Sequence, residues 1–392
     1  MRLAQRVEQL PPYLFARISQ LIAQKRAEGV DVISLGIGDP DIPTPDYLLD
    51  VLRTATTDPA NHRYPESDGL PQFRQAIARW YQKRHNVSLD PDKEIVPLIG
   101  SKEGIAHLPL CLIDPGDTAL ITDPGYPVYE VATMFAGGIT VKVPLREEDG
   151  WLPRLDEIPA ETARAAKVIW LNYPNNPTGA IADRGFYERA VAWAKQYDVV
   201  VAHDLAYADV AYDGYVPMSI LEVDGAKDVA IEFNSLSKSF NMTGWRLGMA
   251  VGNATLVNAL TRVKTNMDSG IPQAIQQMAI AALDDPRDTI ERHNEIYSKR
   301  RDQAIAVLRQ LGLRVEPPKA SLYIWARLPE GERSSAEFAA RLIDATGVVV
   351  TPGASYGPAG EGYIRISLTT PDDRLDEALR RLAAFAQGQS SR

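Results

Sequence analysis

Short apolar segments alternate with amphipathic segments through the middle of the chain, and this alternation limits the possible folds more than any other feature. Apolar runs occur at 95–99, 118–122, 167–172, 198–204, 229–233 and 247–251, and helical patterns include 72–85 and 185–197. Strands that are apolar on both sides are typical of parallel strands covered by helices on both faces. The pattern therefore predicts an α/β fold with a large, doubly wound, mostly parallel sheet.

The pattern changes after Asp285 and Pro286, where a smaller α+β unit is expected. A long helical segment covers 287–311, strands follow at 321–327, 347–351 and 362–368, and helices are expected at 336–345 and 373–387. The N-terminal segment has a helical pattern at 13–28 and a short apolar run at 31–35. We expect it to pack with the C-terminal unit. This gives a large domain of 46–286 and a small domain made of 1–45 and 287–392.

One lysine lies among hydroxyl side chains between two of the apolar runs. Ser235, Ser237 and Ser239 surround Lys238, and Arg246 follows eight residues later. A lysine held near a pocket loses solvation, which lowers its pKa and lets the amine act as a nucleophile. The serines and the arginine suit a phosphate group, because they offer hydroxyl donors and a planar cationic fork. Taken alone, Lys238 would more often be an exposed charge on a solvated turn, since most lysines are surface charges.

Polar clusters follow three of the predicted strands, at 172–179, 204–207 and 235–238. In open α/β sheets, ligands bind at the carboxyl ends of the strands. The turn at Gly100, followed by a helix that begins near Ser101 and Lys102, is a further candidate for phosphate, because the first N–H groups of a helix are unpaired and its dipole favours anions. These segments predict one shared site.

Composition argues against several classes of partner. The net charge is −9, from 42 basic and 51 acidic residues, which disfavours nucleic acid and anionic membranes. Cys111 is the single cysteine, so no intrachain disulfide can form and a reducing compartment is expected. The first residues lack the apolar run of a signal peptide, and no segment reaches the ~20 apolar residues that span a bilayer. We expect a cytoplasmic protein without a metal site.

Five separated motifs resemble, in the same order, the class I/II aminotransferases of fold type I. They are Gly36-Ile-Gly38, Asn175-Asn176-Pro177-Thr178-Gly179, Asp204-Leu-Ala-Tyr207, Ser235-Leu-Ser-Lys238 with Arg246, and Tyr363-Ile-Arg365. The resemblance covers nearly the whole chain. It implies an enzyme that uses pyridoxal 5′-phosphate to move an amino group between an amino acid and a 2-oxo acid.

Within that family the chain is most similar to LL-diaminopimelate aminotransferases and their near relatives. The similarity includes the segments 35–41, 100–107, 241–246 and 264–270. It implies LL-diaminopimelate and 2-oxoglutarate as substrates, in lysine biosynthesis. An alanine/aspartate-type or succinyl-diaminopimelate aminotransferase is the alternative, and a β-lyase would carry the same cofactor residues.

The resemblance also implies roles for individual residues. Lys238 would bind the cofactor and transfer protons, Asp204 would pair with its ring nitrogen, and Asn176 and Tyr207 would hydrogen-bond its ring oxygen. Tyr126 would stack on the ring. The expected phosphate ligands are Ser101, Lys102, Ser235, Ser237, Arg246 and, from a second chain, Tyr64. The expected substrate-binding residues are Tyr13, Gly38, Lys102, Asn176, Asn266 and Arg365.

Two consequences of these assignments concern the substrate and the assembly. Arg365 would bind the substrate α-carboxylate as a two-pronged ion pair. Tyr64 and Asn266 match positions that serve a partner chain, which implies a homodimer with shared active sites. Without the family, Asp204 could cap a helix, Asn176 could belong to a plain turn, and Arg365 could be a surface charge.

Overall fold

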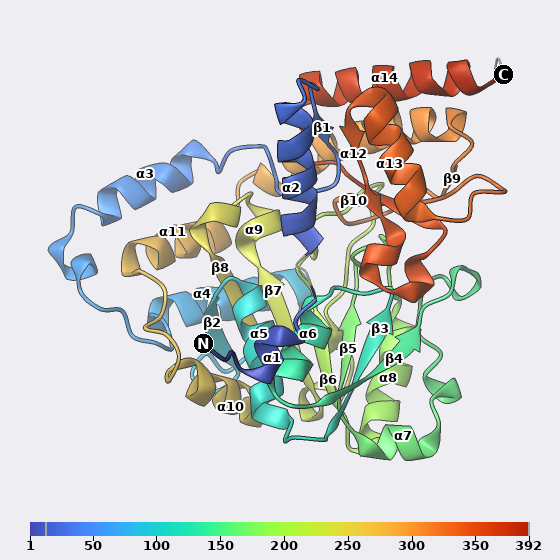
Figure 1. Ribbon diagram of the computed structural model, residues 1–392. Helices are drawn as coiled ribbons and strands as arrows, with labels where there is room; N and C mark the ends of the chain where they lie inside the picture. Colours follow the sequence, from blue (N-terminus) through green and yellow to red (C-terminus); the bar gives the residue numbers. More distant parts are fainter. Residues whose placement is uncertain (12–13, 391–392) are drawn as a thin grey trace.

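A large sheet with helices on both faces forms the centre of the protein (Figure 1). The computed structural model describes residues 1–11 and 14–390. The strand order in the large sheet is β2-β8-β7-β6-β5-β3-β4. Its strands are β2 (Ile95–Ile99), β3 (Thr118–Asp123), β4 (Ile139–Pro144), β5 (Ala166–Asn172), β6 (Val200–Asp204), β7 (Ala230–Ser235) and β8 (Leu247–Gly252). Only β8 runs antiparallel to its neighbours, β2 and β7. The predicted α/β class with a mostly parallel sheet is confirmed.

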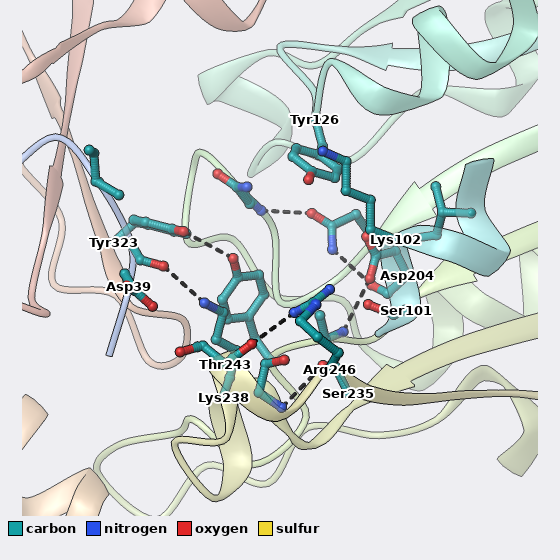
Figure 2. A pocket seen from close by; sticks show the side chains of 18 of the residues that line it. Asp39, Ser101, Lys102, Tyr126, Asp204, Ser235, Lys238, Thr243, Arg246 and Tyr323 are labelled. Carbon is teal, nitrogen blue, oxygen red and sulfur yellow. Dashed lines mark hydrogen bonds between the residues drawn. The ribbon is translucent and has the colours of Figure 1, made fainter. Parts of the chain in front are cut away.

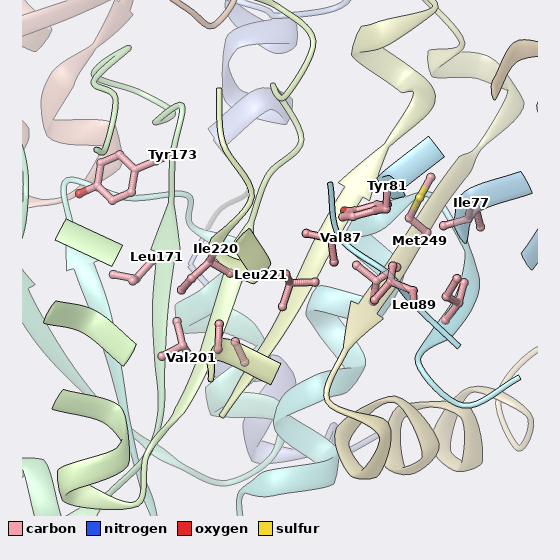
Figure 3. Close-up of a cluster of buried hydrophobic side chains, with 14 of the residues drawn as sticks. Ile77, Tyr81, Val87, Leu89, Leu171, Tyr173, Val201, Ile220, Leu221 and Met249 are labelled. Carbon is pink, nitrogen blue, oxygen red and sulfur yellow. The ribbon is translucent and has the colours of Figure 1, made fainter. Parts of the chain in front are cut away.

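Two layers of helices bury the sheet because its strands are apolar on both sides. One face packs against α4 (Pro71–His85), α8 (Arg184–Tyr197) and α11 (Gln273–Asp284), and the other against α5 (Ser101–Leu112), α6 (Val128–Phe135) and α10 (Ala254–Lys264). On β5, Ile169 and Leu171 point into the first core, while Val168 and Trp170 point into the second, as side-chain alternation along a strand requires. Figure 3 shows part of the first core, from Leu171 to Met249 on β8.

The C-terminal part of the chain forms a four-stranded sheet in the order β12-β13-β10-β9, and β11 pairs with β1. These strands are β1 (Ile33–Ser34), β9 (Arg314–Val315), β10 (Tyr323–Arg327), β11 (Val348–Val349), β12 (Thr351–Pro352) and β13 (Tyr363–Ser367), and the helices around them are α2 (Leu14–Ala27), α12 (Thr289–Gln310), α13 (Ser335–Thr346) and α14 (Asp372–Ser390). The N-terminal α2 contributes Ile18 and Ile22 to a small core with Ile343 and Val349, and it stands beside α13 in Figure 1. The domain division at residues 46 and 286 stays a prediction.

The remaining α-helices have ten residues or fewer. They are α1 (Gln5–Glu8), α3 (Asp46–Ala55), α7 (Ala160–Ala165) and α9 (Leu236–Ser239). The helices α12 and α14 are longer, with 22 and 19 residues. Across residues 1–11 and 14–390, no helix combines the length and the apolar character needed to cross a membrane, and no cluster of three or more His, Cys, Asp or Glu side chains could hold a metal ion.

Two local features differ from the sequence-based expectation. The apolar run at 347–351 does not form one strand, because Val348 and Val349 pair with β1 while Thr351 and Pro352 pair with β13. The connection around Lys238 contains a helical turn, α9. Ser235 caps this turn by accepting a hydrogen bond from the backbone N–H of Ser237 at 3.1 Å. This hydrogen bond fixes where the chain turns from β7 into the helical turn that carries Lys238.

Candidate active site

A cavity of about 530 Å³ lies at the carboxyl ends of β5, β6 and β7. Figure 2 shows labelled side chains from the N-terminal loop, α5, β6, α9 and β10 around this one space. The predicted site residues that line it are Gly38, Ser101, Lys102, Tyr126, Asn176, Asp204, Tyr207, Ser235, Ser237, Lys238 and Arg246. Segments that are far apart in the sequence therefore meet where the strand ends predicted a shared site.

Lys238 projects from α9 into the cavity. Its Nζ donates a hydrogen bond to the backbone oxygen of Gly38 at 2.9 Å. Burial lowers the pKa of this amine, although the nearby Tyr323 phenol and Asp39 carboxylate act in the opposite direction. A lowered pKa increases the fraction of uncharged amine, which is the form that attacks a carbonyl carbon or accepts a proton.

Asp204 ends β6, on the side of the cavity opposite to Tyr323 in Figure 2. The side chain is buried, and its Oδ2 accepts a hydrogen bond from the Tyr129 hydroxyl at 2.8 Å, while Oδ1 accepts one from the Ala206 N–H at 3.3 Å. Burial raises the pKa of this carboxyl, and these hydrogen bonds offset the effect only in part. A cationic ring nitrogen beside Asp204 would favour the ionised form again, so this end of the cavity fits a protonated pyridine.

Two glycines let cationic and N–H groups converge at the anion-binding end of the cavity. Gly100 has φ +72°, and a side chain there would overlap with the Arg246 guanidinium. A side chain at Gly248 would overlap with the backbone nitrogen of Ser101, the first residue of α5. The close approach places Arg246 beside the start of a helix, where backbone N–H groups and the dipole attract phosphate. The residues present therefore fit the phosphate group of the expected cofactor.

Arg365 is fully buried on β13 and borders the cavity through its contacts with Asn176 and Tyr323. Its Nη1 donates to Asn176 Oδ1 and its Nη2 to the backbone oxygen of Gly36, both at 2.8 Å. Its exposed fraction of 0% excludes the interpretation as a surface charge. Both acceptors are neutral, so these two hydrogen bonds do not neutralise the positive charge of the guanidinium. The charge can therefore attract an incoming carboxylate.

Two predicted site residues, Tyr64 and Asn266, do not line the cavity. Tyr64 is 90% exposed. Asn266 is also exposed, and its Nδ2 donates to the backbone oxygen of Arg262 at 2.8 Å. Tyr13 lies outside the described residues. Both exposed side chains are accessible to a second chain, and their contribution to a partner's site stays a prediction.

Two tyrosines at the site were not predicted. Tyr129 donates to Asp204 and stacks on Trp170 at a centroid distance of 4.7 Å. It lies three residues after Tyr126, so helical spacing could have indicated it. Tyr323 lines the cavity and accepts a hydrogen bond from the Tyr207 hydroxyl at 3.1 Å. Its strand reads as an ordinary apolar run, and no local signal distinguishes Tyr323 from a core residue.

Comparison with known proteins gives matches over nearly the whole chain. The family described as aminotransferase class I and II matches residues 30–382. An LL-diaminopimelate aminotransferase of Dehalococcoides mccartyi is 56% identical over 385 residues, which are 98% of this chain and 99% of the relative. The substrate-bound structure of BacF from Bacillus subtilis is 36% identical with a TM-score of 0.94, over 98% of both chains. A probable N-succinyldiaminopimelate aminotransferase from Thermus thermophilus is 39% identical with a TM-score of 0.89, over 95% of this chain and all of the other.

Proposed function

Because this chain belongs to the aminotransferases of class I and II, we propose that it transfers an amino group from LL-diaminopimelate to 2-oxoglutarate. As a member of that family it depends on pyridoxal 5′-phosphate and acts on an amino acid and a 2-oxo acid. The full-length identity of 56% with an LL-diaminopimelate aminotransferase carries the choice of substrate. We place the reaction in lysine biosynthesis and in the cytoplasm. A reducing compartment suits this chain, because Cys111 is its single cysteine and no intrachain disulfide can form.

Five side chains that line or border the cavity divide the chemical work. The bound cofactor supplies an electron sink for the bonds at the substrate α-carbon. Lys238 would hold the cofactor through its amine, and its Nζ, once free, would carry the proton between the substrate α-carbon and the C4′ carbon of the cofactor. Asp204 keeps the proton on the pyridine nitrogen. Tyr207 and Asn176 donate to the ring oxygen, and Arg365 orients the substrate α-carboxylate.

A substrate with an amino acid group at each end suits the polar surroundings of the site. Arg365 accounts for one carboxylate, and Lys102 lines the same cavity. Asn266 and Tyr13 match positions that surround the far end of the substrate in diaminopimelate-specific relatives. A polar pocket rejects analogues that lack the matching groups, because its buried polar atoms are then left unpaired.

The expected result of a substrate panel is that LL-diaminopimelate with 2-oxoglutarate gives a kcat/KM about tenfold or more above that of alanine, aspartate or aromatic amino acids. Asn266→Ala should lower kcat/KM for LL-diaminopimelate by about tenfold more than for alanine, because it removes one polar contact at the far end. Steady-state kinetics with the purified holoenzyme provide the measurement. Thr265→Ala is the matched control, because the exposed Thr265 hydroxyl also donates to the backbone oxygen of Arg262, at 3.2 Å.

Two outcomes of the panel would contradict the substrate assignment. If alanine and pyruvate react best and Asn266→Ala affects all substrates equally, the enzyme is a general aminotransferase. If N-succinyl-diaminopimelate reacts best, the alternative suggested by the 39% identical Thermus thermophilus protein holds. A β-lyase would release ammonia and pyruvate instead of a stoichiometric keto acid.

We also propose a homodimer with shared active sites. Sedimentation of the holoenzyme should give twice the 43.2 kDa mass of the chain. Tyr64→Ala and Lys238→Ala should each lower activity, and a mixture of the two, unfolded and refolded together, should regain activity. The reason is that a hybrid dimer contains one site with an intact Lys238 and an intact Tyr64. A fully active monomer, or a mixture that stays inactive although dimers form, would contradict the shared site.

A further inference from the structure

Tyr323 contacts three groups to which the proposed function gives separate tasks. It is 4% exposed and accepts a hydrogen bond from the Tyr207 hydroxyl at 3.1 Å. The guanidinium carbon of Arg365 lies 3.8 Å from the centre of its ring. Its hydroxyl packs so closely on the backbone of Gly38 that a side chain at Gly38 would overlap with it. One phenol thus joins the expected donor to the cofactor ring, the expected carboxylate ligand and the loop that holds Lys238.

The register of the small sheet fixes the stacking of Tyr323 on Arg365. β10 and β13 are antiparallel, with Tyr323 opposite Ser367 and Trp325 opposite Arg365. Tyr323 and Arg365 are therefore diagonal neighbours on the same face, a distance that an aromatic and a long side chain can bridge. Tyr356 lies 4.8 Å from the guanidinium carbon of Arg365, so tyrosine rings on two sides restrict the planar group.

The hydroxyl of Tyr207 has one hydrogen and cannot donate to two acceptors at once. In the structure this hydrogen is directed to Tyr323, whereas the proposed function requires it at the ring oxygen of the cofactor. The hydrogen bond between the two tyrosines and the one to the ring oxygen can exist together if Tyr323 becomes the donor to Tyr207. Such a reversal is possible because hydroxyl hydrogens rotate freely between partners. In such a chain each hydrogen bond polarises the next, so Tyr207 becomes a stronger donor.

The charges around the two phenols favour this direction. Burial alone would raise the pKa of Tyr323, but the positive charges of Arg365 and Lys238 act against burial, and the pKa lies below its ordinary value. By contrast, burial raises the pKa of Tyr207. The more acidic phenol is the better donor. The charged groups that face this pair and Lys238 are Arg365, Lys238, Arg246, Asp39 and Asp204.

We propose that Tyr323 is a positioning residue that aims the Tyr207 hydroxyl at the cofactor ring oxygen and, through its ring, holds Arg365 flat for the substrate carboxylate. This inference rests on the proposed function and adds a residue to it. The hydroxyl and the ring of Tyr323 act on different partners, so two substitutions separate them. Tyr323→Phe removes the hydroxyl and keeps the ring, while Tyr323→Leu removes both.

The test is a pH titration of the visible absorbance of the bound cofactor in the purified holoenzyme. Donation by Tyr207 stabilises the deprotonated form, so a weaker donor raises the midpoint. Tyr323→Phe should raise it by about half a pH unit, and Tyr207→Phe should raise it further. The double variant should match Tyr207→Phe, because Tyr323 acts through Tyr207. Tyr323→Leu should in addition raise KM for the amino acid more than it changes kcat.

The matched control is Tyr212→Phe, which removes another buried phenol hydroxyl near the same strand. The Tyr212 hydroxyl donates to the backbone oxygen of Ser321 at 2.7 Å and does not reach the cavity, so its loss should leave the midpoint unchanged. An unchanged midpoint in Tyr323→Phe, or additive shifts in the double variant, would overturn the inference. A wild-type protein without a visible cofactor band would instead overturn the proposed function itself.

Discussion

Lys238→Ala should lower kcat by about five orders of magnitude, or ~7 kcal/mol of transition-state stabilisation, because one substitution removes both the attachment of the cofactor and the proton carrier. Lys238→Arg should be similarly inactive, since guanidinium keeps the charge but stays protonated. The loss would show that the amine, rather than the positive charge, is required. Single-turnover and steady-state assays of the purified variants provide the measurement.

Reduction with borohydride tests the attachment directly. In the wild type, reduction followed by digestion and peptide mapping should place the cofactor on Lys238, and the Lys238→Ala variant should retain none after dialysis. Lys167→Ala is a control for general effects of losing a lysine, because that side chain is half exposed and its contact is Asp117. The assignment is wrong if the mapped peptide carries the label on Lys102, the other lysine of the cavity.

Asp204→Asn should lower kcat by about 10³-fold, or ~4 kcal/mol, while most of the cofactor affinity remains. A neutral amide cannot hold the proton on the pyridine nitrogen, but its oxygen can still accept the hydrogen bond from Tyr129 that positions Asp204 in the structure. The geometry of the site is therefore kept while its charge is lost. The measurements are kcat and the dissociation constant of the cofactor, from fluorescence quenching.

Tyr129→Phe separates the charge of Asp204 from its positioning. The variant keeps the carboxylate and removes one hydrogen bond to it, so kcat should fall by about tenfold rather than 10³-fold. Asp228→Asn is a control for the loss of a carboxylate away from the cavity, because Asp228 pairs with Lys195 near the surface. Turnover of Asp204→Asn close to that of the wild type would refute the role given to the carboxylate.

Six of the seven strands of the large sheet were predictable from the sequence, because strands that are buried on both faces are continuous apolar runs. The edge strand β4 was not predicted, because only Val143 of its six residues is buried. The run at 95–99 and β2 coincide, and Ser101 begins α5 as the turn at Gly100 indicated. Most of the candidate site followed from the same property, since polar residues at strand ends meet at one edge of a parallel sheet. No local feature of the sequence indicated that β8 is antiparallel to its neighbours, because the apolar composition of a strand does not encode its direction.

The runs at 321–327 and 362–368 contain β10 and β13, but the sequence could not divide the run at 347–351 between two sheets or reveal the role of Tyr323. The run at 347–351 is almost entirely apolar, and only its partners decide that Val349 belongs with β1 and Thr351 with β13. Tyr323 precedes three apolar core residues in its strand, and its task depends on Tyr207 and Arg365, which are distant in the sequence. Arg365 itself was expected from its motif, but its complete burial depends on contacts with Tyr356 and with Gly36 and Asn176, of which the last two are far away in the sequence.

The way in which Arg365 is held has a consequence for the rates of binding. Its guanidinium is already without solvent, flanked by two rings and fixed by two hydrogen bonds before any carboxylate arrives. Little side-chain freedom remains to be lost on capture, and such rigidity increases affinity without any added contact. Substrates that share the α-carboxylate should therefore associate at similar rates, and their discrimination should lie in how long each one stays bound.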